Sequence, residues 1–504
     1  MVNLLQIHPN VPMAVYLKYH SKPDKMKKTL IIISALSIFS ACSEKDFDIN
    51  YDPDNLSPQA TTLALQLPAG MAGIAGAQGA YYTIFGGFWA QYYTQSNSAS
   101  QYRNLDAYSA GTNDYNRAWS AMYDGLGDLR TVKRKAFQQG NWKYYLIATT
   151  LEVHASQLMT DFYGDIPYAE ANQQDILEPK FNTGPEVYDL MITDLKTALA
   201  KDLATSVGET PSSDDFVFGG NMANWKAFAN TLLLKIYMRQ TKVNPSLAQT
   251  EITSLINSGV TFLDTDAAIT QFEDAPNRSN PFYETDRRQL NVATNIRAST
   301  TMNSFLLSNN DPRRDNFYTP GAALNQGDFN NTTLGSSSIA VLIINATDPL
   351  YFMSRSESLF LQAEALARYF GGAGAKEKYD AGVLEAFNRY SKDGAPFIAA
   401  TGVYKYPDGT LDDNLKAIIT QKWVSGFPAN GFEAFFDQNR TGYPKISAVP
   451  QSDAGYIPGE LAYSIEGITG GVFPRRFVYP NTVQTRNRFA PDLEKITTPV
   501  WWAK

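Results

Sequence analysis

The residues best suited to ligand chemistry lie in one aromatic stretch, residues 86–97 (GGFWAQYYTQSN). Its rings present flat apolar faces with polar edges, which stack on the apolar faces of sugars. Its side-chain amides offer both donors and acceptors to hydroxyl groups, and its two glycines leave the backbone accessible. With one tyrosine just beyond, the candidate ligand-binding residues are Trp89, Gln91, Tyr92, Tyr93, Asn97 and Tyr102. The pattern favours a site for a neutral oligomer, and the alternative is a helix that packs these rings into the core.

A second candidate segment, residues 277–288, combines Phe282 and Tyr283 with two arginines. Arg287 and Arg288 would suit an acidic sugar or a peptide carboxylate, because a guanidinium group binds a carboxylate through paired N–H donors. We therefore expect Phe282 and Tyr283 to contact a ligand. A solvated loop is the alternative interpretation of this segment.

Side chains suited to catalysis or metal binding are scarce. Asp161, Asp165 and Glu170 could act as a glycosidase pair only if two of them flanked a sugar at about 5–9 Å, and their position predicts helix capping and a turn instead. His154 lies among apolar neighbours and predicts a packing role. With three His and one Cys in the whole sequence, we predict no catalytic residue, no metal site and no cofactor.

The N-terminal region predicts that the protein is exported to the cell envelope. Lys27 and Lys28 precede an apolar run of ten residues, 30–39. That run is too short to span ~30 Å of hydrocarbon at ~1.5 Å per residue, so it predicts a signal peptide. Small residues and the only cysteine, Cys42, follow it. We expect Cys42 to be lipidated and to anchor the protein through its acyl chains, and an ordinary secreted protein is the alternative.

These signals divide the chain into four parts. Residues 1–25 have no signal-peptide character and are interpreted as an upstream start artefact, with Met26 as the true start. Residues 26–41 form the predicted lipoprotein signal peptide, and residues 42–58 an acidic, extended tether. Residues 59–504 then form the predicted binding domain. The formal net charge of −7 disfavours nucleic acid as a partner of the whole protein.

Apolar residues recur at three- and four-residue spacing along much of this domain, which predicts amphipathic helices. The stripe along 224–239 is the widest, and capping boxes at Thr183–Glu186 and Ser354–Glu357 start two others. The predicted helices are 119–137, 142–159, 187–203, 224–239, 246–258, 359–370, 375–390 and 411–424.

The segments between these helices predict large loops. Residues 205–222, 262–292 and 319–348 are rich in Gly, Asn, Ser, Asp and Pro, and loops of such length are typical of functional sites. Strand signals occur only at 339–344 and 473–478. We therefore predict a mainly α fold in which helix pairs carry a large loop-rich portion.

Five stretches, in order along the chain, resemble motifs of the SusD/RagB family, in particular its second SusD-like branch. They are 161–168 (DFYGDIPY), 232–239 (LLLKIYMR), 357–365 (ESLFLQAEA), 421–444 (QKW followed by EAFFDQNRTGYP) and 474–480 (PRRFVYP) with Asn487 beyond it. The resemblance covers about residues 42–504. Within these motifs, Arg239, Arg440 and Arg475 are predicted to pair with carboxylates or cap helix ends rather than contact a ligand.

The resemblance implies four tetratricopeptide-like helix pairs and a loop-rich half that holds the ligand. It implies a non-enzymatic lipoprotein of the outer-membrane surface, which binds oligosaccharide nutrients and delivers them to a SusC-like TonB-dependent transporter. It does not imply starch, because the Trp-rich platform of the family's starch binders is not visible. Peptide capture by the same architecture, a surface glycoside hydrolase and a pure assembly scaffold are the alternatives.

Overall fold

The computed structural model describes residues 61–290, 292 and 294–504. The predicted start artefact, signal peptide, lipidation site Cys42 and tether lie outside these residues. Residues 62–504 form one folded unit, and the description below concerns that unit.

Helices make up most of the regular structure of the described chain, as predicted. The long helices are α2 (Leu63–Ala77), α5 (Asn116–Gln139), α6 (Trp142–Tyr163), α7 (Gly184–Leu199), α8 (Met222–Arg239), α9 (Pro245–Asn257), α13 (Arg355–Tyr369), α14 (Ala375–Asn388), α16 (Leu411–Ser425) and α17 (Gly431–Thr441). Each of the eight predicted helices is confirmed, with ends within four residues of the prediction. Their apolar stripes and end signals are local, so the sequence suffices to place them.

The shorter helices lie mainly between the long ones. They are η2 (Gln78–Tyr82), α3 (Thr83–Trp89), α4 (Arg103–Asp106), η3 (Leu203–Thr205), α10 (Pro281–Tyr283), η4 (Glu284–Gln289), α11 (Thr300–Ser308), α12 (Arg314–Phe317), η5 (Ser336–Ser338), α15 (Ala395–Ile398), α18 (Asn481–Arg486) and η6 (Trp501–Ala503). Helix α2 was not predicted because Pro68 and several glycines interrupt it, and such residues indicate a helix break in sequence.

Strands are short and few in the described chain. Strand β1 (Tyr93–Gln95) pairs antiparallel with β3 (Ile296–Ala298), and β2 (Ala267–Ile269) pairs antiparallel with β4 (Leu350–Met353). The predicted strand at 339–344 is wrong, since this segment makes only isolated bridges, and 473–478 is irregular. Without a continuous partner strand, β-branched residues alone do not form a ladder.

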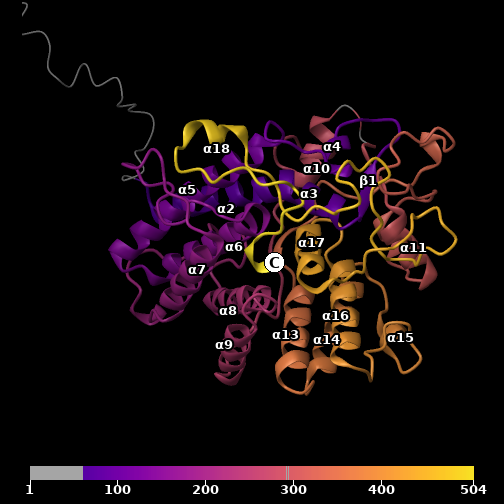
Figure 1. Cartoon of the computed structure of the whole chain (residues 1–504). Coiled ribbons are helices and arrows are strands. Elements are labelled where there is room, and N and C mark those ends of the chain that lie inside the picture. Colours follow the sequence, from indigo (N-terminus) through magenta and orange to yellow (C-terminus); the bar gives the residue numbers. More distant parts are fainter. Residues whose placement is uncertain (1–60, 291, 293) are drawn as a thin grey trace, which may run out of the picture. The chain divides into compact units, whose positions relative to one another are not determined.

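Successive long helices pack side by side. Helices α5 to α9 pack in sequence, α8 contacts α13, and α13 packs on both α14 and α16. Figure 1 shows this series continuing from the magenta helices α6–α9 to the orange helices α13, α14 and α16. The fold is therefore mainly α, a scaffold of tetratricopeptide-like helix pairs joined to a loop-rich portion.

A buried ionic network joins α6, α8 and α17. Arg239 pairs with Asp161 at 3.0 Å and with Glu433 at 2.6 Å, and Lys235 pairs with Glu433 at 2.9 Å. Arg440 binds the Glu364 carboxylate. The predicted structural roles of Arg239 and Arg440 are confirmed. Arg475 instead donates to the side-chain oxygen of Asn439, at 2.6 Å.

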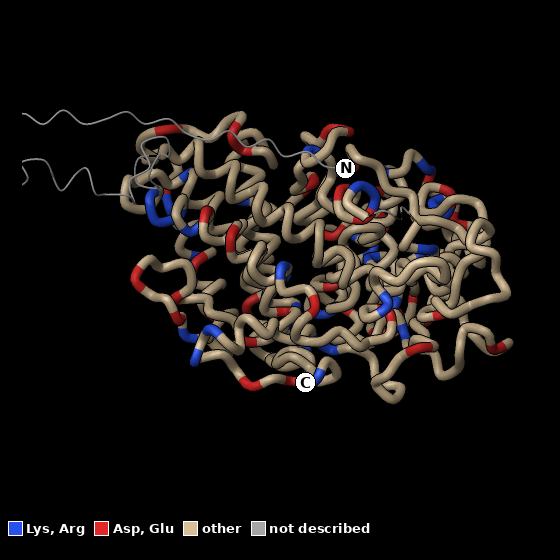
Figure 2. Tube along the Cα trace, turned by 90° about the horizontal axis from the view of Figure 1, so that it is seen from above, with Lys and Arg blue, Asp and Glu red and all other residues tan. Residues whose placement is uncertain are grey.

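Charges are distributed along the described unit. Figure 2 shows Lys and Arg residues intermixed with Asp and Glu residues along the Cα trace. Within the part of the chain that the structure describes, every helix is too short or too polar to cross a membrane.

Candidate ligand-binding cavity

The predicted aromatic platform is part of the core. Trp89 is only 3% exposed, its indole N–H donates to the Leu105 carbonyl at 3.2 Å, and its ring packs on Phe435. The hydroxyl of Tyr92 donates to the carbonyl of Trp423, and that of Tyr93 to the carbonyl of Thr83. These rings therefore present no open face to a ligand, and the expectation of an exposed platform is corrected to core packing.

The polar members of the stretch are also engaged. Gln91 is fully buried and its side-chain oxygen accepts from the hydroxyl of Thr301 at 2.6 Å. Tyr102 is buried beside Phe88. Asn97 is half-buried, and its amide nitrogen donates to the carbonyls of Asn331 and Leu334. Helix α3 is buried on every side, so the sequence stretch has no solvent face on which to display its rings.

The second predicted segment is divided between core and cavity. Phe282 is buried, yet it lines the cavity described below. Tyr283 is half-buried beneath the guanidinium group of Arg288, which lies 5.4 Å from the ring centre. Arg287 and Arg288 pair with Asp286 and Asp274, carboxylates of the protein itself.

The carboxylates near the end of α6 bind the protein's own donors. Asp161 accepts from the hydroxyl of Tyr188 at 2.5 Å and the indole of Trp502 at 2.8 Å, and burial raises its pKa to about 6 despite Arg239. Asp165 and Glu170 accept backbone N–H groups. Asp165 caps the start of α7 as predicted and Glu170 binds the backbone of a nearby loop, whereas Asp161 belongs to the buried ionic network instead.

His154 is a core residue. Its Nε2 atom lies 2.8 Å from the side-chain oxygen of Gln78, and burial lowers its pKa to about 3. Among the described residues, no group of three or more His, Cys, Asp or Glu side chains could hold a metal ion.

The structure places a cavity of about 380 Å³ between the helix scaffold and the loop-rich portion. It is bounded by the start of α13, the ends of α14 and α16, strand β4 and the loop around residues 343–349. Phe282, Tyr351, Tyr390 and Phe427 provide its aromatic surface. This volume is within the range of small-molecule sites, about 300–1,000 Å³.

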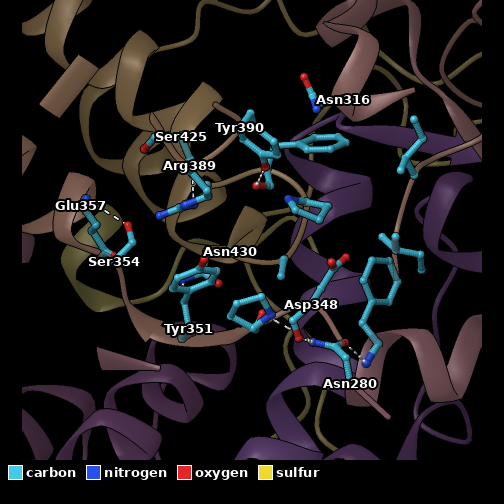
Figure 3. A pocket seen from close by; sticks show the side chains of 18 of the residues that line it. Asn280, Asn316, Asp348, Tyr351, Ser354, Glu357, Arg389, Tyr390, Ser425 and Asn430 are labelled. Carbon is cyan, nitrogen blue, oxygen red and sulfur yellow. Dashed lines mark hydrogen bonds between the residues drawn. The ribbon is translucent and has the colours of Figure 1, made fainter. Parts of the chain in front are cut away.

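Four buried polar atoms around this cavity have no hydrogen-bond partner among the described residues. They are the side-chain oxygens of Asn316 and Asn430, Oε1 of Glu357 and Nη2 of Arg389. Figure 3 shows their side chains around one space, with Glu357 and Asn316 on opposite sides. An unsatisfied buried polar group costs about 1–3 kcal/mol, so a polar ligand or water that bonds to these atoms would be stabilised in the cavity.

Helix ends position the two charged members of this set. Arg389 is the C-cap of α14, donates from Nη1 to the Ser425 carbonyl at 3.0 Å, and lies 4.3 Å above the Tyr351 ring centre. Its Nη2 atom is 4.0 Å from the carboxylate of Asp266, beyond hydrogen-bond distance. One edge of the guanidinium group is therefore held by the protein and another remains available.

Glu357 lies in the first turn of α13. The Ser354 hydroxyl accepts its backbone N–H at 3.1 Å, so this half of the predicted capping box forms. The Glu357 carboxylate instead approaches Lys235, at 3.7 Å. Burial raises the pKa of Glu357, and Lys235 partly offsets that effect. The network around it holds the pKa of Glu433 well below its ordinary value, because Lys235 and Arg239 outweigh the effect of burial.

The arrangement can hold a compact molecule rich in hydroxyl groups. Each hydroxyl donates one hydrogen bond and can also accept, so a molecule with three or more hydroxyls can donate to the oxygens of Asn316, Asn430 and Glu357 and accept from Arg389. Sequence reasoning identified only Phe282 and, as a helix cap, Glu357. Asn316, Arg389 and Asn430 carried no signal, because they come from separate segments that only the fold brings together.

Comparison with solved structures shows which known proteins share this fold. Similar solved structures include a SusD homologue from Bacteroides uniformis, with 24% identity, 88% of this chain and 99% of that chain covered and a TM-score of 0.69. A chitin-binding SusD homologue from Flavobacterium johnsoniae has 23% identity, 87% and 98% coverage and a TM-score of 0.71. No curated protein matches the chain.

A family model describes the chain more directly. The SusD-like model described as "Starch-binding associating with outer membrane" matches residues 70–480, most of the described chain. That span includes the helix scaffold and every residue named around the cavity. The chain therefore belongs to this SusD-like family.

Proposed function

We propose that this protein is a lipid-anchored receptor of the outer-membrane surface that binds oligosaccharides and delivers them to a SusC-like TonB-dependent transporter. Membership of a family described as starch-binding and associating with the outer membrane supports glycan binding. The cavity between the helix scaffold and the loops is the binding site in this proposal.

The observation that carries the proposal is the set of four buried polar atoms beside aromatic rings that have no hydrogen-bond partner among the described residues. A sugar presents hydroxyl groups at its edges and apolar C–H surface on its faces, which matches planar polar groups and rings in one cavity. Water could satisfy the same atoms, and a sugar that displaces weakly held water gains affinity.

The structure supports the hydrolase alternative less well than the binding function, because the candidate catalytic carboxylates are already occupied. Asp161, Asp165 and Glu170 are engaged by backbone and side-chain donors of the protein. Peptide capture by the cavity is an outcome that the binding experiment distinguishes.

Calorimetry on the full chain, purified in detergent, tests the proposal with maltoheptaose, cellohexaose, chitohexaose and a mixed pool of short peptides. We expect at least one of the oligosaccharides to bind and Asn430→Leu to weaken it by about tenfold, the effect of one hydrogen bond. Asn257→Leu, on the exposed end of α9 and away from the cavity, is the matched control and should leave affinity unchanged. Binding of peptides alone would replace glycan capture with peptide capture.

Delivery needs a separate measurement. A β-barrel transporter should co-purify with the chain from outer membranes, and the pair should take up the bound oligosaccharide only while the TonB system is energised. Uptake that persists after deletion of this chain would contradict a delivery role.

A further inference from the structure

We infer that the cavity recognises the end of a glycan chain, admitting one terminal, unsubstituted sugar with free adjacent hydroxyl groups. This inference rests on the proposed function and adds to it the part of the glycan that is bound. It follows from the closed floor of the cavity, its small volume and the chemistry of its free atoms.

The floor of the cavity is sealed by the core. Glu357 is 4% exposed and Lys422 is 5% exposed. Behind them, Lys422 pairs with Asp437 at 2.8 Å, and Glu433 pairs with both Lys235 and Arg239. A chain cannot pass through this packed ionic network, since separating a buried ion pair is strongly unfavourable.

The opposite side of the cavity reaches the surface. The side chain of Asp315 is 78% exposed, and Asn345 is exposed in the neighbouring loop. In Figure 3, Asn316 lies on the side away from Glu357 and Ser354. A cavity with one exposed rim and a closed floor admits a chain end, whereas the middle of a polymer would need an open groove.

The size of the cavity limits what enters. Its volume of about 380 Å³ is at the lower end of the range for small-molecule sites. A terminal sugar with part of its neighbour is therefore the expected occupant, and later units would lie outside the rim.

The free atoms suit adjacent hydroxyl groups. The oxygens of Asn430 and Glu357 accept, and Nη2 of Arg389 donates. Adjacent sugar hydroxyls can donate to the first two while accepting from the third. Substituents on these hydroxyls would remove the donors and leave the oxygens unpaired, which lowers affinity.

The charges around the cavity disfavour an acidic sugar. Four carboxylates line it, those of Asp315, Asp348, Glu357 and Glu433, against the cations Arg389 and Lys422. Lys422 is already paired with Asp437, and Glu433 with Lys235 and Arg239, so three other lining carboxylates remain against the lining cation Arg389. A uronate or sulfate would meet a surplus of negative charge, because like charges placed close together repel.

A length series tests end recognition. Maltose to maltoheptaose and the matching chitin oligosaccharides are titrated into the full-length protein. Affinity is expressed per oligosaccharide molecule. We expect affinity to change less than about twofold beyond the second sugar unit, because later units lie outside the cavity. Affinity that rises steadily with length would overturn the inference and leave the proposed function intact. No binding by either series, together with no binding of cellohexaose in the calorimetry above, would overturn both.

Blocking each end identifies the end that enters. One arm uses oligosaccharides reduced with borohydride, which opens the reducing-end ring. The other uses oligosaccharides with a cyclic acetal over two hydroxyls of the non-reducing end. Loss of binding in one arm supports the inference and names the end, and unchanged binding in both arms overturns it.

Substitutions of cavity residues test whether the glycan binds in this cavity. Asn316→Leu removes a free oxygen without breaking a hydrogen bond of that atom among the described residues, so the fold should persist. We expect it, and Arg389→Met, to weaken binding of the best oligosaccharide by about tenfold each. Arg488→Met, at a residue with a side chain 72% exposed, is the control for Arg389→Met. Thermal unfolding identifies a variant that fails to fold, and full affinity in a folded Asn316→Leu protein would contradict the site.

Discussion

Arg389 is held on two sides and available on a third. Its guanidinium group donates to Ser425 and covers the ring of Tyr351, while Nη2 has no hydrogen-bond partner among the described residues. Because the bound edges fix the orientation of the planar group, little side-chain entropy remains to be lost when a ligand binds. Arg239 has the same side chain, yet carboxylates surround it and it serves the core.

Trp89 gives the residue-scale prediction. Trp89→Ala should lower the free energy of unfolding by about 3–5 kcal/mol, because it removes a large buried ring and the indole hydrogen bond to Leu105. Urea unfolding measures this loss. The folded fraction should keep its affinity for any glycan that the wild type binds. A Trp89→Ala protein that is as stable as the wild type but no longer binds glycan would show that the ligand site lies in the aromatic stretch.

At the scale of elements, glycines set the approach of α3 to α17. The sequence suggested that Gly86 exposes backbone to a ligand. In the structure Gly86 faces Gly431, and a Cβ on Gly86 would lie 2.0 Å from the backbone nitrogen of Phe432. The glycines therefore allow two helices to touch, and this contact holds the aromatic stretch in the core.

Substitution at Gly86 tests this contact. Gly86→Ala should destabilise the fold by more than about 2 kcal/mol, since backbone atoms must move apart to admit the methyl group. Gly76→Ala in α2 is the control, because nothing lies within 4 Å of the added atom there. It should be neutral or stabilise by up to about 1 kcal/mol through helix propensity. Equal unfolding curves for the two variants would refute the close-packing argument.

The pairing of α13 with α17 predicts a pH dependence. Glu364 accepts two hydrogen bonds from Arg440, at 2.6 and 2.7 Å, and one from Arg368. Burial opposes ionisation, yet these arginines lower the pKa of Glu364 from its ordinary value of 4.5 to about 2. Between these values the unfolded state binds more protons than the folded state, so stability falls as pH falls.

The lowered pKa of Glu364 sets both the direction and the size of the change in stability with pH. Its contribution, about 3 kcal/mol, is complete above pH 5 and declines as pH falls toward 2. The stability difference between the wild type and Glu364→Gln should therefore narrow between pH 5 and pH 3, as measured by urea unfolding at each pH. A difference that stays constant over this range would show that Glu364 does not carry the effect.

At the scale of the whole molecule, the scaffold and the loops have different tasks. Helices α5 to α9 and α13 to α16 pack through their apolar faces, and the loops close one side of the cavity against α14 and α16. Acidic and basic residues are intermixed along the described unit, as Figure 2 shows. Membership of a family associated with the outer membrane agrees with the signal peptide and lipid anchor predicted at the N-terminus.

The anchor gives the prediction for the whole molecule. Cys42→Ala should move the protein from the membrane fraction to the soluble fraction, because it removes the thiol that we propose carries the acyl chains. Fractionation and immunoblotting measure the shift, and Ser43→Ala is the control. Membrane retention of Cys42→Ala would require another means of attachment.

The sequence by itself determined the family and eight of the ten long helices in the described part of the chain. The stripe along 224–239 and the end signals around Thr183 and Asn244 depend on residues a few positions apart, so they predicted α7, α8 and α9 closely. The five ordered motifs, including the one at 421–444, predicted membership of the SusD-like family, which the family model confirms.

Only the tertiary structure decided which polar and aromatic residues face a ligand. Trp89 and Tyr92 have side chains suited to sugar binding, yet packing against distant segments buries them. Asn316, Arg389 and Asn430 have no sequence signal that marks them as ligand-binding residues, and they meet only because separate segments fold together. Burial depends on contacts between residues far apart in sequence, so composition and spacing determine local structure but not the surface that remains open.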